Sequence, residues 1–201
     1  LIKPINPSQI LLSVKKLLQN KQLIDERTTQ SYQQDFMNIS MAFGDAEDHQ
    51  DWADIYRKLT YWEMQIDDTE NKNMLPVLES QKIEANANFC RFIKDNYLDW
   101  MEEKNPTKPL LSYQVMKKKV FPQLQEKKPL FFIVIDNFRL DQWEDIESII
   151  APYFNIKDKD TYYSILPTTT AFARNALFSG MMPMDMARFY PQFWEDEDSD
   201  E

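Results

Sequence analysis

The sequence has very few of the residues on which several common binding sites depend. Among its 201 residues are two glycines, Gly44 and Gly180, one cysteine, Cys90, and one histidine, His49. A nucleotide loop of the G-x-G-x-x-G or Walker type needs closely spaced glycines, so both loop types are excluded. A single cysteine excludes an internal disulfide and is typical of proteins in a reducing cytoplasm, which is the location we expect.

Positive charge and long apolar runs are also scarce. The chain has 23 Lys and Arg residues against 33 Asp and Glu residues, which gives a formal net charge of -10. Binding to a nucleic-acid backbone depends on clustered positive charge, so direct DNA binding is not expected. No run of 18 apolar residues is present and the N-terminus has no apolar signal segment, so membrane insertion is not expected either.

Hydrophobic residues are plentiful, and their spacing predicts helices in the first half of the chain. They make up 43% of the residues, with 13 Phe and five Trp. The chain starts at Leu1 rather than at a methionine, so we expect it to be a piece of a longer protein. Asn6 and Pro7 suit the cap and first position of a helix. From about Asp25 to Glu103, three amphipathic stripes predict a helical bundle. The stripes cover residues 32–43, 52–66 and 74–101.

The tryptophans on these stripes have two interpretations. Trp52, Trp62 and Trp100 recur at helical spacing, which favours a place in the bundle core. In the alternative, a partly exposed stripe forms a groove for a partner or a face for a second copy of the chain. Cys90 follows Phe89 on the third stripe and is predicted to be a core residue.

The pattern changes after the bundle. Two prolines in the segment Asn105–Pro109 prevent a helix from continuing. Ser112 then suits the cap of a short basic helix that contains Lys117, Lys118 and Lys119, and we interpret these lysines as a solvated face.

The last third predicts the opening of an α/β fold. Residues 130–135 are six apolar residues in a row, which is typical of a strand buried on both faces of a parallel sheet. A helix over 143–150, a second strand over 161–166 and a helix over 171–178 closed by Gly180 follow. The predicted fold class is therefore α plus α/β, a helical bundle followed by the start of an α/β domain.

Two places in this segment carry candidate chemistry. Asp136 follows the first predicted strand, and Pro167 to Thr170 follow the second, directly before a helix. Parallel strands in open α/β sheets bind ligands at their carboxyl ends, where one metal ion is able to contact both places. Hydroxyls at a helix N-terminus lie beside free backbone N–H groups and the positive end of the helix dipole. Both favour a bound anion and an ionised hydroxyl oxygen, and a metal ion adds to this effect. The alternative is that Asp136 and the threonines only cap turns and helices.

These segments resemble a known family. Residues 134–139 and 164–180 together resemble the start of a PglZ domain in the alkaline phosphatase superfamily. The resemblance implies that Asp136 is a metal ligand, that Thr170 is a metal-bound nucleophile, and that the complete domain holds two zinc ions. Zinc sites draw on His, Cys and carboxylates, and His49 and Cys90 lie far away in the sequence. We therefore expect the remaining ligands to follow Glu201 and this chain alone to be inactive.

The N-terminus carries a second resemblance. Lys3 and Pro4, followed by a capped helix, resemble the end of a response-regulator receiver domain, in which the lysine contacts the phosphorylated aspartate. Together, the receiver end, the helical bundle and the PglZ opening resemble PorX-like response regulators. The resemblance to PglZ implies that the α/β segment begins an alkaline-phosphatase-like domain. The implied domains are the end of a receiver (1–20), a helical bundle (21–105), a linker with a short basic helix (106–128) and the N-terminal part of a PglZ domain (129–201).

The resemblance implies a function in signalling. It implies a two-component response regulator with a zinc-dependent phosphoesterase effector, a phosphodiesterase, tied to type IX secretion. The implied partners are a sensor histidine kinase, a component of the secretion machinery and a second copy bound on phosphorylation. The alternative function is a non-catalytic adaptor that dimerises and binds a secretion-machinery partner.

Overall fold

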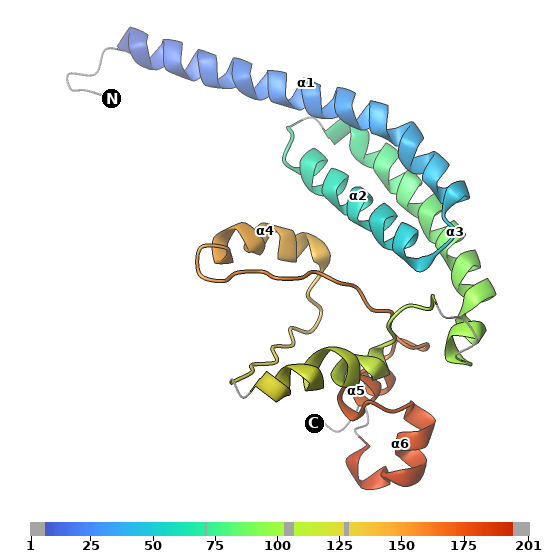
Figure 1. Cartoon of the computed structure of the whole chain (residues 1–201). Helices are drawn as coiled ribbons and strands as arrows, with labels where there is room; N and C mark the ends of the chain where they lie inside the picture. Colours follow the sequence, from blue (N-terminus) through green and yellow to red (C-terminus); the bar gives the residue numbers. More distant parts are fainter. Residues whose placement is uncertain (1–6, 71, 103–106, 127–128, 195–201) are drawn as a thin grey trace. The chain divides into compact units, whose positions relative to one another are not determined.

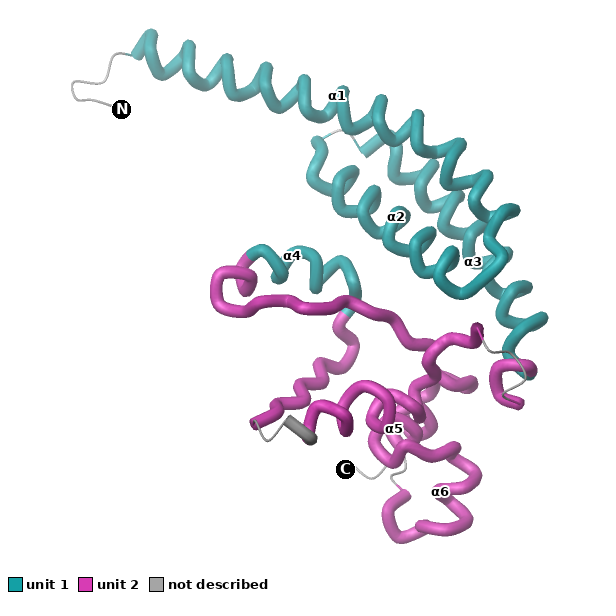
Figure 2. Tube along the Cα trace, in the orientation of Figure 1, with its two compact units in different colours: residues 1–98, 139–148 teal, residues 99–138, 149–201 magenta. Residues whose placement is uncertain are grey.

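The computed structural model describes residues 7–70, 72–102, 107–126 and 129–194. The chain divides into two compact units, which are coloured separately in Figure 2. Residues 1–98 and 139–148 belong to the first unit, and residues 99–138 and 149–201 belong to the second. Each unit is described in turn.

Three long helices build the first unit (Figure 1). They are α1 (Pro7–Asp45), α2 (His49–Asp67) and α3 (Leu75–Met101), with a short 3-10 turn, η1 (Lys72–Met74), before α3. Asp48 caps the N-terminus of α2 reciprocally, because its side chain accepts the N–H groups of Gln50 and Asp51 while the Asp51 side chain accepts the N–H of Asp48. The three predicted helical stripes are confirmed.

The stripes meet in one hydrophobic core. The core positions of α2, from Trp52 to Ile66, recur every three or four residues, so they lie on one face of that helix. The core consists of Tyr32, Ile39, Phe43, Trp52, Ile55, Leu59, Trp62, Ile66, Leu78 and Ala85. Trp52 and Trp62 are 5% and 6% exposed. The alternative in which these two tryptophans line an open groove is therefore wrong, since they fill the bundle.

Helix α1 is much longer than the core it covers. Its first half extends beyond α2 and α3 (Figure 1), and every residue from 7 to 24 is exposed. This stretch includes apolar side chains at helical spacing, among them Leu11, Leu17 and Ile24, which are 71%, 68% and 60% exposed. One uninterrupted helix thus joins the predicted capped helix to the first helix of the bundle.

A small polar network is buried inside the bundle. The Tyr32 hydroxyl donates to Gln81 Oε1 at 3.0 Å, and Gln81 Nε2 donates to the Phe36 carbonyl at 2.9 Å and to Ser40 Oγ at 2.8 Å. Tyr32 and Gln81 are 1% and 2% exposed. Because burial penalises the phenolate, it raises the pKa of Tyr32 to about 12.

This network predicts a loss of stability in alkali. An unfolded tyrosine loses its proton near its ordinary pKa of 10.0, whereas folded Tyr32 keeps it to about 12. Between these values the unfolded state binds fewer protons, so the free energy of unfolding falls as pH rises, by on the order of 2 kcal/mol. We expect denaturant unfolding from pH 9 to 12 to show a steeper fall for the native chain than for Tyr32→Phe. Equal slopes would contradict the assignment.

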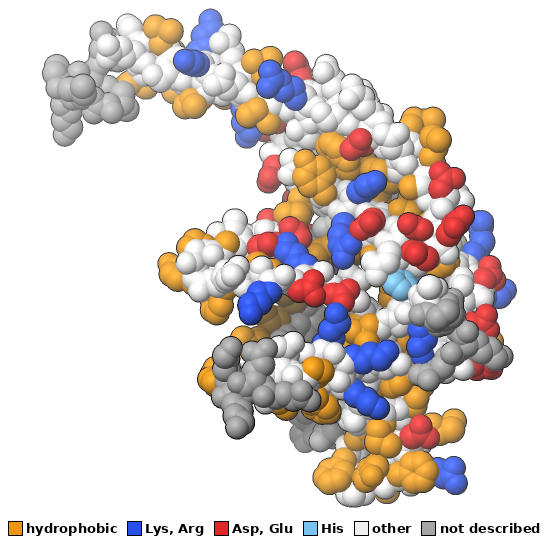
Figure 3. All heavy atoms as spheres, viewed as in Figure 1, with side chains coloured by type: hydrophobic (Ala, Val, Ile, Leu, Met, Phe, Trp, Pro, Cys, Tyr) orange, Lys and Arg blue, Asp and Glu red, His pale blue; other side chains and the backbone are white. Residues whose placement is uncertain are grey.

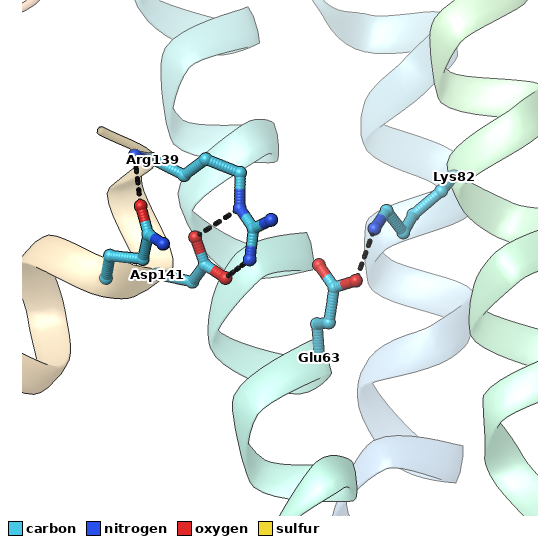
Figure 4. Close-up of polar contacts among 5 residues, drawn as sticks. Glu63, Lys82, Arg139 and Asp141 are labelled. Atoms are coloured by element: carbon cyan, nitrogen blue, oxygen red, sulfur yellow. Dashed lines mark hydrogen bonds and ion pairs between the residues drawn. The ribbon is translucent and has the colours of Figure 1, made fainter. Parts of the chain in front are cut away.

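Figure 4 shows two of the ion pairs on the surface of the first unit. Lys82 Nζ lies 2.7 Å from Glu63 Oε1 and joins α3 to α2. At the start of α4 (Leu140–Ile150), Arg139 Nε donates to Asp141 at 2.9 Å, and a second guanidinium nitrogen contacts the same carboxylate. This hydrogen bonding holds the pKa of Asp141 below its ordinary value. Exposed pairs of this kind contribute little to stability.

The second unit is made of short helical segments. They are η2 (Ser112–Gln114), η3 (Met116–Val120), η4 (Phe121–Glu126), α5 (Thr170–Ser179), α6 (Pro183–Phe189) and η5 (Pro191–Phe193). The basic segment with the three lysines is a π-helical turn rather than a regular helix. Ser112 is not its cap, because Ser112 Oγ accepts the N–H of Ile165 at 3.2 Å. That bond ties two distant segments together.

The predicted second strand is reduced to one contact. Leu111 and Tyr163 form a single parallel bridge, with the Ser112 N–H donating to the Tyr163 carbonyl at 2.9 Å and the Tyr163 N–H to the Leu110 carbonyl at 2.8 Å. Trp100 packs edge-to-face on Tyr163, with ring centroids 5.5 Å apart. Trp100 therefore belongs to this unit and not to the bundle core in which it was predicted.

The predicted first strand is not a strand in the structure. Residues 130–135 have no regular secondary structure, and their side chains are 42% to 84% exposed. A buried strand takes its hydrogen bonds from neighbouring strands, and the residues that the structure describes include no strand of any length. The prediction of an α/β opening is thus not met by this part of the chain.

Candidate functional site

Asp136 lies at the end of the exposed apolar segment 130–135. Its carboxylate is exposed, and Oδ1 accepts the N–H of Asn137 at 2.9 Å. Asn137 has a φ of 55°, the left-handed conformation that asparagine tolerates better than most residues. This bond and backbone geometry turn the chain sharply directly after Asp136.

The threonine loop enters α5. Thr169 is the N-cap residue, with φ -64° and ψ 151°, and its side chain makes no capping bond. Thr170 is therefore the first residue of the helix and not its cap, which removes the capping interpretation for Thr170. The Ala173 N–H donates to the Thr169 carbonyl at 2.9 Å, while α-helix geometry directs the N–H groups of the first turn out of the helix end.

The helix behind this loop ends as the sequence predicts. Gly180 is the C-cap, with a φ of 67°, and its N–H donates to the Ala176 carbonyl at 3.1 Å. Only glycine adopts this conformation without strain. Thr168, Thr169 and Thr170 are all exposed, so the loop hydroxyls are open to solvent.

The described residues do not fit a zinc site. No group of three or more His, Cys, Asp or Glu side chains that is able to hold a metal ion occurs in the part of the chain that the structure describes. One carboxylate and one hydroxyl do not complete a tetrahedral centre. His49 begins α2, and Cys90 is exposed on α3, which contradicts its predicted place in the core.

The receiver residues Lys3 and Pro4 lie outside the described residues.

Sequence reasoning also passed over Arg174, which follows Thr170 by four residues in α5. Residues four apart share one face of a helix, so this spacing was a readable signal. Arg174 lines a cavity of about 520 Å³ together with residues of α6 and η5.

Comparisons with known families match two parts of the chain. Residues 22–101 match the model of the PorX response regulator linker domain. Residues 115–201 match the model of the BREX system PglZ alkaline phosphatase-like domain. No curated protein matches the chain. The first match ends at the last residue of α3, and the second includes both Asp136 and Thr170.

Among the described residues, no helix combines the length and the apolar character that crossing a membrane requires.

Proposed function

We propose that this chain, which matches both a PorX response regulator linker model and a PglZ alkaline phosphatase-like model, works in a two-component response regulator with a phosphoesterase effector. The effector is a zinc-dependent phosphodiesterase, and its output acts on type IX secretion. A sensor histidine kinase supplies the input. The occurrence of both matches in one chain is the observation that carries this proposal, since a response regulator linker domain connects a receiver to an effector, and the PglZ match supplies the effector.

We propose the same division of the chain as its sequence suggests. Residues 1–20 end a receiver, 21–105 form the bundle, 106–128 connect, and 129–201 begin the PglZ domain. The boundary between receiver and bundle then falls inside α1 (Pro7–Asp45). A signal crosses such a boundary through a continuous helix, without a loop between the two domains.

Within the effector, Thr170 is the proposed nucleophile. Its hydroxyl lies at the N-terminus of α5, where first-turn N–H groups and the helix dipole stabilise the charge that develops on a phosphoryl group. Asp136, which follows the apolar segment 130–135, is the proposed metal ligand. The family resemblance implies zinc, but the described donors do not form its site, so the roles assigned here stop at the two side chains.

Hydrolysis of bis(p-nitrophenyl) phosphate tests this function. We expect turnover by the full-length protein that is lost on chelation and restored by zinc. This chain alone is expected to be inactive, and it serves as a control for contaminating activity. A folded full-length protein that shows no turnover with any divalent metal would favour the adaptor, in which the bundle forms a homodimer and binds a secretion-machinery partner.

A further inference from the structure

The last turn of α3 lies within the second unit and is fastened there. Trp100 is 2% exposed and packs edge-to-face on Tyr163, and Lys108 Nζ donates to the Trp100 carbonyl at 3.3 Å, close to the end of the helix. Residues 22–101 match the response regulator linker domain, so these contacts hold the end of that linker. The linker therefore ends on a defined partner, the ring of Tyr163.

Tyr163 is itself fixed by backbone hydrogen bonds. Its N–H donates to the Leu110 carbonyl at 2.8 Å, and its carbonyl accepts the Ser112 N–H at 2.9 Å. Both bonds belong to the parallel bridge between Tyr163 and Leu111. A shift of the Tyr163 backbone therefore moves residues 110–112 with it or breaks two hydrogen bonds.

The same short segment holds the chain that leads into the threonine loop. Ser112 Oγ accepts the N–H of Ile165 at 3.2 Å, and both residues are buried. A buried N–H that loses its partner is costly, so this bond fixes the position of Ile165. Ile165 precedes Thr170 by five residues, and no helix or strand lies between them. The position of Ser112 therefore constrains the loop that presents Thr170.

Residues 110–114 also contact the helix that begins with Thr170. The short helix η2 (Ser112–Gln114) packs against α5, and a Cβ at Gly180 would lie 3.5 Å from the Tyr113 carbonyl oxygen. The segment thus contacts the chain before the threonine loop and also the far end of α5. A displacement of this segment reaches Thr170 from both sides.

Burial distinguishes these contacts from the rest of the second unit. Hydrophobic side chains gather on the surface over α6, at the lower edge of Figure 3, and Met184 there is 82% exposed. Leu111, in contrast, is 0% exposed. Closely packed residues transmit a displacement to their neighbours, whereas exposed side chains adjust to it. The contacts from Trp100 to Ile165 are therefore the part of this unit that is suited to carry a signal.

We propose that the Trp100–Tyr163 contact couples the end of the linker to the threonine loop and in this way regulates Thr170. A change in the position of the last turn of α3 moves Tyr163, which shifts residues 110–112 and changes the order of the loop. The coupling is a property of the structure, and only its consequence for catalysis rests on the proposed function of Thr170.

Hydrogen exchange measured by mass spectrometry on the full-length protein tests the coupling. Tyr163→Leu and Trp100→Leu each remove one ring of the contact, and we expect both to raise the exchange rate of the amides in residues 165–170 roughly tenfold or more. The double variant is expected to exchange within about twofold of either single variant, because the two rings act through one contact. Loop exchange within about twofold of the native rate in both single variants would overturn the proposal.

Two control variants separate the contact from a general loss of structure. Tyr163→Phe keeps the ring, and Tyr162→Leu makes the same change at a neighbour that is 48% exposed, so we expect both to keep the native exchange rate. Tyr163 is less buried than Trp100, so Tyr163→Leu decides the question if Trp100→Leu fails to fold. Loop exchange raised equally by Tyr162→Leu would overturn the proposal, since the effect would not depend on the contact.

Beryllofluoride, which mimics a phosphoryl group on aspartate, tests the regulation. We expect it to change loop exchange roughly fivefold or more in the native full-length protein. In Tyr163→Leu we expect the loop to respond less than about twofold, while the response of α1 persists. A response of α1 without a response of the loop in the native protein would overturn the proposed regulation.

Two further outcomes concern the proposed function instead. If beryllofluoride changes exchange in neither α1 nor the loop, the receiver input is contradicted, and the exchange of the variants without beryllofluoride still decides the coupling. If hydrolysis of bis(p-nitrophenyl) phosphate is absent, the phosphoesterase is contradicted, and the exchange measurements are unaffected because they do not depend on turnover.

Discussion

Replacement of Thr170 by valine in the full-length protein is expected to abolish phosphodiester hydrolysis while leaving the fold intact. Valine keeps the shape of threonine and removes only the oxygen. If that oxygen attacks phosphorus, the barrier rises by on the order of 4 kcal/mol or more, a rate loss of ~10³-fold or greater. Thr170 is exposed and is not the N-cap of α5, so little stability is at risk.

The neighbouring threonines provide matched controls. Thr168→Val and Thr169→Val make the same chemical change within two residues of Thr170, and we expect both to retain most of the activity. Thr169 is the N-cap but makes no side-chain capping bond, so its replacement costs less than the ~1 kcal/mol of a bonded cap. Hydrolysis and thermal unfolding are measured on all three variants. Retained hydrolysis by Thr170→Val would eliminate it as the nucleophile and favour the adaptor function.

The second large effect is expected in the bundle, where Trp62→Ala should cost roughly 3–5 kcal/mol. Trp62 is 6% exposed, its ring lies 5.4 Å from that of Tyr32, and its indole N–H donates to Asp35 at 3.2 Å. Alanine leaves a cavity at the meeting of α1 and α2 and removes the donor. Total stabilities of about 5–15 kcal/mol make this loss a large fraction of the whole.

Tyr61 is the matched control, because it neighbours Trp62 in sequence and is 53% exposed. We expect Tyr61→Ala to change the free energy of unfolding by less than about 1 kcal/mol, although its ring lies 5.1 Å from that of Trp62. Urea unfolding followed by far-ultraviolet circular dichroism measures both variants. A Trp62→Ala variant as stable as Tyr61→Ala would mean that Trp62 is not part of the core.

Local patterns predicted the helices well, and long-range packing explains the errors. The helix predicted over 171–178 is α5 (Thr170–Ser179), because Gly180 stops it by backbone conformation alone. Cys90 was misplaced by one position: one residue along a helix is a turn of about 100°, so Phe89 reaches the core and Cys90 points away from it.

Errors that depend on distant partners are of another kind. A run of apolar residues such as 130–135 specifies that burial is favourable but not which strands supply the hydrogen bonds. Trp100 likewise fits a helical stripe, yet its partner is Tyr163, 63 positions further along the chain. No periodicity within α3 contains that information.

The candidate site was also predictable only in its local features. The sequence predicted that Asp136 follows an apolar segment, that the threonine loop precedes a helix, and where α5 starts. The zinc ligands were not, because a metal site is assembled from segments that only the folded chain brings together.

The length of α1 has a mechanical consequence. Its 39 residues span about 58 Å at 1.5 Å per residue, and no proline interrupts it after Pro7. Because the helix is continuous, a rotation or displacement of its uncovered end is transmitted to the end that packs in the bundle, and the helix has no hinge to absorb it. Each residue added to or removed from the uncovered half rotates one end of the helix relative to the other by about 100° about the helix axis. The spacing of this half therefore sets the relative orientation of whatever its two ends carry.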